Sequence, residues 1–554
     1  MTHDAVAQRN VRRLPALVPL VFAALAALHL YPVSLAPARW AQHWNADTQQ
    51  WEWTMAWIAH EVVRAPLQLF NGNIFAPERG VLAYSDPMIA PGLAGAPLAW
   101  LGASPILEFN LLIAVGWIVT AVIAWRIARE WWTNSSLPAE ASGEGGAALV
   151  AGALAVYNVH LLTRVPHLNA AHIWGVPLAL GLTDRVVEHP RLRSAAALAV
   201  ALFLTAITSL YALALALVAT GIVAVIRARR LRTWMSIAGA VSVAGLAAAG
   251  PLWPYVQLAA AGASRPMEIV AQFSASPGGY LASTSRVHNV WSSAFYTNDV
   301  NVFFAGVTAL VLATLGVARG LRGSATERQR TLVLIALAVT GVVLSLGPAT
   351  PVYRVLYDVF PPARGLRAAA RFGYLYLLAI AIAAPGGVLW IADRIRRGTP
   401  SRRVVLVAAA SLGLVTAEVW QGPVRATPFT GLPGIYRTLA DTSSAVMLVE
   451  VPFYPADAAH EGGEYVVNAT VHWRPVMNGY SGFIPGSYRR RAASFWFFPA
   501  PWAIDEVKKE GATHVMVHLE KFGPEAADVE RTLAARQDFQ LIASSGVHRL
   551  YLLK

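Results

Sequence analysis

The sequence contains no cysteine, few charged residues and only four lysines. The lack of cysteine excludes disulfide bonds and thiol chemistry. Charged residues make up 14% of the 554 positions and hydrophobic residues 56%. A soluble core of this length cannot bury that much apolar material, so the composition excludes an ordinary soluble protein and predicts a multi-pass membrane protein.

Long apolar runs, such as ILEFNLLIAVGWIVTAVIAW from Ile106, reach the roughly 20 residues that cross a bilayer as a helix. The predicted spans are 14–36, 106–125, 146–163, 168–183, 194–209, 211–226, 234–257, 300–318, 331–347, 372–392 and 404–420. The first run follows Arg9, Arg12 and Arg13 but has no clean cleavage site, so we expect a retained helix instead of a signal peptide.

Arginine predicts the orientation of these spans, because cytoplasmic loops hold the excess of positive charge. With the N-terminus in the cytoplasm, 21 arginines fall inside and ten lie in the outward loops of the membrane region. The net charge of +13 therefore needs no nucleic-acid partner. We expect a protein of the bacterial cytoplasmic (inner) membrane.

The odd number of spans places the tail outside the cytoplasm. The tail holds all four lysines and alternates strand-like pieces (AVMLVEVPF, THVMVHL, HRLYLLK) with helix-like pieces (AIDEVKKEG, EAADVERTLAAR). The predicted fold is an α-helical polytopic membrane domain, residues 1–425, followed by a soluble external α/β domain, residues 426–554.

The first external loop, residues 37–105, contains the stretch HWNADTQQWEW and continues as WEWTMAWIAHEVVRA. We expect an amphipathic helix here that lies along the membrane interface, where tryptophan is enriched. His43 and Asp47 belong to this stretch, and Asp86 follows later in the loop. Partial desolvation by the aromatic side chains would make Asp47 a suitable general base, while an ordinary helix-start residue is the structural alternative.

Two further groups of polar residues lie on the outward side. His167 and His172, in RVPHLNAAHIW, can donate to an anionic ligand or serve as interfacial polar residues, and their spacing argues only weakly for metal. The loop 348–371 carries Arg354, Arg364, Arg367 and Arg371 on the side where positive charge is sparse. We expect Arg367 and Arg371 to lie one helical turn apart and the group to clamp a lipid phosphate; snorkelling to ordinary headgroups is the alternative.

A resemblance to a known family rests on the position of Asp47 and on the stretches NGNIFAPERGVLAYSD, HLNAAHIWGVPLAL, PPARGLRAAARF and, in the tail, VEVPFYP and VMNGYSGFIPGSY. With these features the chain resembles the GT-C superfamily of membrane glycosyltransferases. The resemblance implies a sugar transfer from a polyprenyl-phosphate donor, with Asp47 as the acidic residue of the first loop. Many members have two acidic residues separated by one. Here Asn45 and Ala46 precede Asp47, so only one carboxylate of the paired metal-binding motif is present.

The expected reaction is an inverting transfer with Asp47 as base, Asp86 orienting the acceptor or sharing a cation with Asp47, and arginines receiving the leaving phosphate. Tyr480 is expected to be exposed in a turn that meets acceptor sugars or lipid; a plain loop between strands is the alternative. The expected partners are the lipid-linked donor, a glycan, lipid or protein acceptor, and membrane lipids. No cofactor is assigned, and a divalent cation stays an open alternative.

Two other functions compete with this reading. A lipid or polysaccharide transporter or flippase would place ionisable groups near the bilayer midplane, whereas the predicted polar groups collect at the outer rim. A catalytically degenerate member, retained as an assembly partner, is compatible with the single carboxylate of the first-loop motif.

Overall fold

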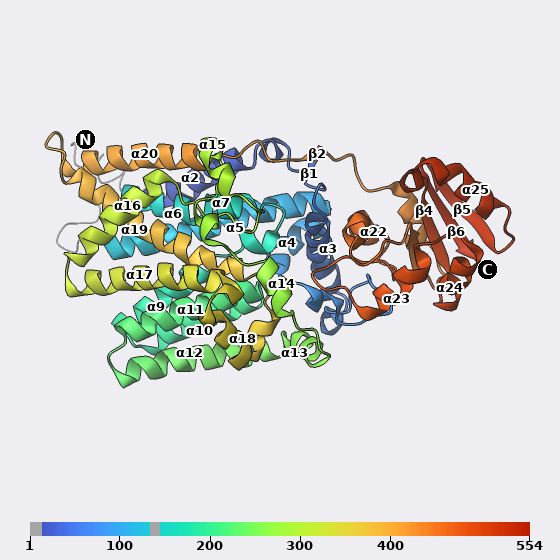
Figure 1. Cartoon of the computed structure of the whole chain (residues 1–554), viewed down its shortest axis with the longest axis horizontal. Helices are drawn as coiled ribbons and strands as arrows, with labels where there is room; N and C mark the ends of the chain where they lie inside the picture. Colours follow the sequence, from blue (N-terminus) through green and yellow to red (C-terminus); the bar gives the residue numbers. More distant parts are fainter. Residues whose placement is uncertain (1–13, 133–143) are drawn as a thin grey trace. The chain divides into compact units, whose positions relative to one another are not determined.

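The computed structural model describes residues 14–132 and 144–554, which form two compact units (Figure 1). The first unit joins the described part of Met1–Leu35 with Leu112–Val165 and Asn169–Val424. The second unit joins Ala36–Leu111, Pro166–Leu168 and Arg425–Lys554. The first external loop and the tail therefore share a unit, and the independence of a 426–554 domain stays a prediction.

The first unit is built from helices. Its long helices are α2 (Leu14–His29), α6 (Glu144–Val156), α9 (Gly175–Glu188), α10 (Leu192–Ala206), α11 (Leu210–Arg227), α12 (Leu231–Ala249), α16 (Val307–Leu321), α17 (Ala325–Ser345), α19 (Tyr374–Ala392) and α20 (Pro400–Val419). Short helices connect them: α7 (Val159–Leu162), α13 (Trp253–Ala260), α14 (Met267–Gln272), α15 (Asn289–Ser292) and α18 (Pro351–Val359). Helices α5 (Pro105–Trp132) and α8 (Leu168–Ala171) begin in the second unit and continue into the first.

Helix α19 is the central helix of this unit and packs against α6, α16, α17 and α20. Its approach to α16 depends on glycine: a Cβ on Gly316 would lie 2.0 Å from the carbonyl oxygen of Ala383, and one on Gly387 would lie 2.1 Å from that of Leu312. Small residues allow such close helix crossings, which are typical of membrane bundles.

Each of the eleven predicted spans overlaps at least one helix, although 146–163, 168–183 and 234–257 are each divided between two helices, and the helical polytopic fold class is confirmed. Five helices are long and apolar enough to cross a membrane within the described ranges, and several others are shorter apolar helices. The number of crossings stays a prediction. Helices α5 and α9 extend beyond the ends of the predicted spans, to Trp132 and Glu188.

Charged side chains at the ends of α9, α11 and α17 pair with one another. Asp184 is buried and forms ion pairs with Arg227 and, at 2.8 Å, with Arg330. Arg330 also lies 2.7 Å from Glu188. Buried charges need partners of opposite sign, and this network provides them.

In the second unit, helix α3 (Ala46–Glu61) packs against α4 (Ile89–Trp100) and α22 (Gly463–His472). Every residue from Thr48 to Ala59 is buried. The prediction of an amphipathic interfacial helix is therefore wrong, because neighbouring elements cover α3 on all sides. Its tryptophans are internal donors: Trp53 Nε1 donates to Asn73 Oδ1 at 2.9 Å, and Trp57 Nε1 donates to the Leu69 carbonyl at 2.8 Å.

The tail contains a four-stranded sheet in the order β3-β4-β6-β5. Strands β3 (Leu448–Val451) and β4 (His514–His518) are parallel, and β5 (Phe539–Ser545) and β6 (His548–Leu553) form an antiparallel hairpin. The remaining tail helices are α21 (Arg437–Ala440), α23 (Gly486–Phe495), α24 (Pro501–Lys509) and α25 (Ala526–Ala534), of which α25 lies against β5 (Figure 1). A short pair, β1 (Trp40–Ala41) with β2 (Thr427–Pro428), joins the first loop to the start of the tail.

Candidate active site

Asp47 lies in the first turn of α3, two residues after Asn45, which caps the helix. The Asn45 side chain accepts a hydrogen bond from the Asp47 backbone N–H at 2.9 Å. An asparagine at this position satisfies one of the free N–H groups of a helix start, and an acidic residue in the first turn is favoured by the helix dipole. The sequence NAD therefore forms the helix start and places Asp47 in the first turn.

Both carboxylate oxygens of Asp47 contact a polar side chain. The Tyr480 hydroxyl donates to Oδ1 at 2.6 Å, and His167 Nε2 lies 2.8 Å from Oδ2. The side chains of Asp47 and His167 remain 26% and 21% exposed. Three predicted site residues, from three distant segments, thus meet within the second unit.

The loop that carries Tyr480 is held by the two residues just before the tyrosine. Asn478 accepts from the Glu450 N–H at 2.8 Å and donates to the Glu450 carbonyl at 2.9 Å. Phe75 N–H donates to the Asn478 carbonyl at 2.8 Å, and a Cβ on Gly479 would lie 2.6 Å from the Phe75 ring. Tyr480 is partly buried, so the prediction of an exposed tyrosine is wrong: its hydroxyl is directed at Asp47.

His43 lies nearby in sequence but pairs with Glu52, a residue that the sequence analysis missed. His43 Nε2 lies 2.7 Å from Glu52 Oε2, and Glu52 is fully buried. Burial lowers the pKa of His43, but the charge of Glu52 and the hydrogen bond with it outweigh burial and raise that pKa. Burial also raises the pKa of Glu52, although His43 opposes this. A substrate-binding role for His43 stays a prediction.

Asp86 is buried in the same unit, two residues after the turn Val81–Tyr84. That segment borders the Tyr480 loop, since a Cβ on Gly482 would lie 2.8 Å from the carbonyl oxygen of Tyr84. Its assignment as the second catalytic carboxylate stays a prediction. Among the described residues, no group of three histidine, aspartate or glutamate side chains could hold a metal ion.

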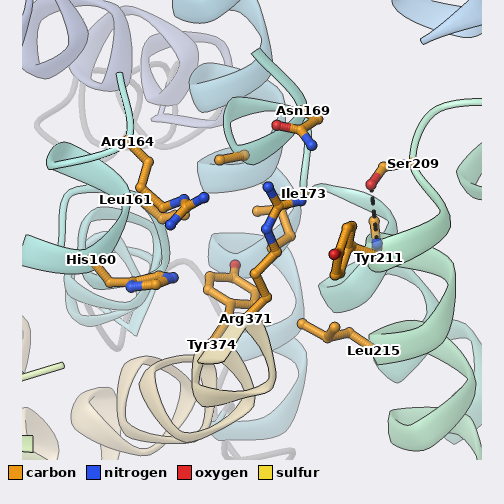
Figure 2. A pocket seen from close by; sticks show the side chains of 12 residues that line it. His160, Leu161, Arg164, Asn169, Ile173, Ser209, Tyr211, Leu215, Arg371 and Tyr374 are labelled. Atoms are coloured by element: carbon orange, nitrogen blue, oxygen red, sulfur yellow. Dashed lines mark hydrogen bonds between the residues drawn. The ribbon is translucent and has the colours of Figure 1, made fainter. Parts of the chain in front are cut away.

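The first unit contains a pocket where α7, α8, the start of α11 and the turn Ala369–Gly373 meet (Figure 2). Arg164, Arg371 and His160 line it together with the polar side chains of Asn169, Ser209 and Tyr211. The Arg371 guanidinium lies over the Tyr211 ring, 4.0 Å from its centre, and the Tyr211 hydroxyl accepts from the Ala368 N–H at 2.9 Å. Tyr211 thus fixes both the loop before Arg371 and the guanidinium itself.

Arg164 was not among the predicted site residues, although it is one of the ten arginines that the orientation places outside. Arg164 is buried, and burying a guanidinium costs free energy unless polar groups compensate it. Its place in a polar pocket therefore makes it a candidate site residue. Its position against the usual charge asymmetry was the signal that could have identified it.

The other arginines of the loop 348–371 do not form one clamp. Arg364 donates to the carbonyls of Tyr357 and Asp358 at 3.1 and 3.0 Å, which caps the end of α18. Arg367 lies over the Phe273 ring at 4.5 Å. The expectation that Arg367 and Arg371 lie one helical turn apart is wrong, because the backbone at Leu366 and Ala368 is non-helical. Lipid-phosphate binding by Arg364 and Arg367 stays a prediction.

His172 lies in the first unit and is separated from His167 by the boundary between the units. Its ring is buried, and Nε2 lies 3.0 Å from the Leu112 carbonyl oxygen. The side chain packs where α8 crosses α5: a Cβ on Gly116 would lie 3.0 Å from the His172 ring. A substrate-binding role for His172 stays a prediction, and the observed contacts are those of a packing residue.

Comparison with solved structures identifies the fold. The structure of the arabinofuranosyltransferase AftD from Mycobacteria matches with a TM-score of 0.63 and 17% identity, over 98% of this chain and 40% of AftD. A mutant form of AftD matches with a TM-score of 0.57 over 98% of this chain and 41% of that chain. ArnT from Cupriavidus metallidurans, bound to undecaprenyl phosphate, gives a TM-score of 0.47 at 12% identity over 97% of both chains.

The chain therefore has the fold of the GT-C membrane glycosyltransferases, as predicted, and it spans about 40% of the AftD chain. No family model matches the chain, and no curated protein matches it.

Proposed function

We propose that this protein is a membrane glycosyltransferase that moves a sugar from a polyprenyl-phosphate donor to a hydroxyl acceptor. The acceptor oxygen attacks the anomeric carbon while the bond from that carbon to the phosphate oxygen breaks. The acceptor proton passes to Asp47, and the polyprenyl phosphate leaves as an anion. Attack opposite the leaving group inverts the anomeric configuration.

The observation that carries this proposal is the environment of Asp47. Its carboxylate is oriented by Tyr480 at 2.6 Å and His167 at 2.8 Å, yet it keeps enough exposure to meet a substrate hydroxyl. A general base must be within hydrogen-bond reach of the proton that it removes, and fixed orientation reduces the cost of reaching that geometry. An ordinary helix-start residue needs neither of the two side-chain contacts.

The pocket of Arg164 and Arg371 supports binding of the donor phosphate. Guanidinium groups bind phosphate oxygens through two parallel hydrogen bonds, and positive charge stabilises a departing phosphate better than a proton does. Because phosphate is a good leaving group, the reaction needs one base instead of the two carboxylates that flank the bond in glycoside hydrolysis. Asp86 would orient the acceptor.

We infer that the reaction takes place on the external face of the bacterial cytoplasmic membrane. The asymmetry of arginine between the two sets of loops supports this orientation. AftD is named as an arabinofuranosyltransferase, so a pentofuranosyl donor is the first to test. Hexosyl donors are the second choice.

The test is mass spectrometry of membrane glycolipids and surface polysaccharide from cells that lack the protein. The cells are complemented with wild type, Asp47→Asn or Glu78→Gln at equal expression, the last as a carboxylate control in the same loop. We expect one sugar to be lost from a glycan and restored by wild type and Glu78→Gln only. Full restoration by Asp47→Asn would overturn the base role and favour a transporter or an assembly partner.

A further inference from the structure

A second polar and aromatic surface lies beside the start of α3. Helix α22 begins against the start of α3. A Cβ on Gly463 would lie 2.9 Å from the Ala46 Cβ and 2.3 Å from Gln49 Oε1. Ala46 precedes Asp47 directly, and Gly463 precedes Glu464 directly. The close approach of the two helix starts therefore brings Glu464 to the vicinity of the Asp47 site within the same unit.

Glu464 forms an ion pair with Lys521 that is enclosed by aromatic rings. The Lys521 Nζ lies 3.1 Å from Glu464 Oε1, 5.8 Å from the centre of the Tyr454 ring and 5.7 Å from that of Tyr465. The side chains of Lys521 and Glu464 are 20% and 36% exposed. Both are thus accessible, and neither belongs to the hydrophobic core.

The aromatic surface continues from Tyr454 to Trp496. Their ring centres are 5.9 Å apart, and Trp496 is 44% exposed at the end of α23. The position of Tyr454 is held by its backbone carbonyl, which accepts from the Tyr488 hydroxyl at 2.9 Å. Tyr454, Trp496, Lys521 and Glu464 together are called the platform below.

The chemistry of the platform points to one class of ligand. Partly exposed aromatic rings stack on the apolar faces of sugars. The ion pair has no net charge, which disfavours selection of an anion. The ammonium group has two donors left after the contact with Glu464, and the carboxylate keeps free lone pairs. Hydroxyl groups satisfy both kinds of site, whereas an acyl chain would leave them unpaired in an apolar contact.

We propose that the platform is a subsite for a neutral glycan and that this glycan is the acceptor in the transfer reaction. The second half of this proposal rests on the function proposed above; the first half does not. The platform would hold a sugar unit remote from the reacting hydroxyl, and the start of α22 would connect it to the unit that meets Asp47. Among the three acceptor classes considered above, the proposal therefore assigns a glycan, in place of a lipid or a protein.

The experiment measures glycan binding separately from transfer. Full-length protein in nanodiscs is mixed with neutral hexasaccharides of glucose, mannose, galactose, xylose and arabinose and with hexagalacturonate as the anionic control. Saturation-transfer NMR reports binding to wild type, Trp496→Ala, Lys521→Gln, Trp502→Ala and Asp47→Asn. Trp502 is the matched control, because it is also exposed but its ring packs on Phe497, with the ring centres 5.3 Å apart.

We expect at least one neutral hexasaccharide to bind, with affinity reduced about tenfold or more by Trp496→Ala and Lys521→Gln and unchanged by Trp502→Ala. Asp47→Asn should weaken glycan binding less than either platform variant does while it abolishes transfer, so the two results distinguish loss of the base from loss of the subsite. Preferred binding of hexagalacturonate, absence of binding by every neutral glycan, or unchanged binding to both platform variants would overturn the proposal. Lys521→Gln keeps the test valid if Trp496→Ala does not fold.

Discussion

In the first unit several arginines lie against aromatic rings. Arg371 over Tyr211, Arg367 over Phe273 and Arg330 over Trp131 share this arrangement. In the second unit the carboxylate of the candidate site, Asp47, is held by a neutral and a weakly basic side chain, Tyr480 and His167. One unit is thus suited to receive an anion, and the other is suited to accept a proton. The predictions below test this division.

The largest expected difference concerns the position of the two sets of loops relative to the membrane. Because the chain has no cysteine, single cysteines can be introduced without background. We expect Ser443→Cys, exposed in the tail, to react with an impermeant maleimide on intact spheroplasts. Ser324→Cys, exposed before α17, should react only after permeabilisation. Equal labelling of both sites in intact cells would refute the orientation.

The second prediction concerns the carboxylate. Asp47→Asn should reduce kcat by about 10²–10⁴-fold, the usual contribution of a general base, while the KM for the donor changes little. Asp86→Asn should reduce kcat less than Asp47→Asn does, because an orienting residue that becomes an amide keeps part of its hydrogen bonding to the acceptor. Steady-state kinetics with a synthetic polyprenyl-phosphate donor would measure both. A larger loss for Asp86→Asn would reverse the two assignments.

The third prediction concerns the cation pocket. Arg371→Ala should raise the donor KM by about 10–100-fold, since a hydrogen bond to a charged group contributes roughly 1.5–3 kcal/mol. Arg364→Ala tests the predicted loop clamp against the pocket: it should raise the donor KM less than Arg371→Ala does, because the Arg364 guanidinium caps α18. The same kinetic assay decides the question. If Arg364→Ala had the greater effect, donor binding would belong to the exposed loop instead of the pocket.

The fourth prediction concerns the orientation of Asp47. Tyr480→Phe removes one donor to the carboxylate and should lower kcat by about tenfold. Gly479→Ala should act in the same direction, because the added methyl group collides with Phe75 and displaces the loop. Gly434→Ala is the control, since nothing lies within 4 Å of a Cβ there. Unchanged kcat in both loop variants would show that Tyr480 does not orient the base.

The smallest effect is expected for pH. The pKa of His43 is raised above 6.5 in the folded protein, because Glu52 outweighs the opposing effect of burial. Its stabilising contribution is therefore complete below about pH 6.5 and is lost as the pH rises through the folded-state pKa. The raised pKa of Glu52 acts in the same direction.

Thermal unfolding in detergent should thus show a lower midpoint at pH 9 than at pH 6. In Glu52→Gln this dependence should be flatter and the protein less stable by about 1–3 kcal/mol. A steeper pH dependence in the variant would exclude the His43–Glu52 pair as its origin.

Several features could be predicted from the sequence because they depend on local composition. Apolar length located each long helix of the first unit, and the position of Asp47 at a helix start was named as the structural alternative for that residue. The strands β3, β4 and β6 followed from short alternating or β-branched segments. In each case the signal lies within the segment itself.

Other features could not be read from one segment. Helix α3 has the composition of an interfacial helix, yet α4 and α22 bury it. The approach of Tyr480 to Asp47 joins residues that are 433 positions apart, and Arg164 shares its pocket with Arg371 from a distant segment. Patterns of neighbouring residues do not show which distant residues will be in contact.

By itself, then, the sequence determined that this chain is a helical membrane protein with one acidic residue at the start of its first-loop helix. Hydrophobic length and capping chemistry act over neighbouring residues, so they can be read directly. Only the tertiary structure decided which side chains surround that residue. The contacts of Asp47 with Tyr480 and His167 arise when the first loop, the segment Pro166–Leu168 and the tail pack into one unit, and packing over such distances depends on the whole chain.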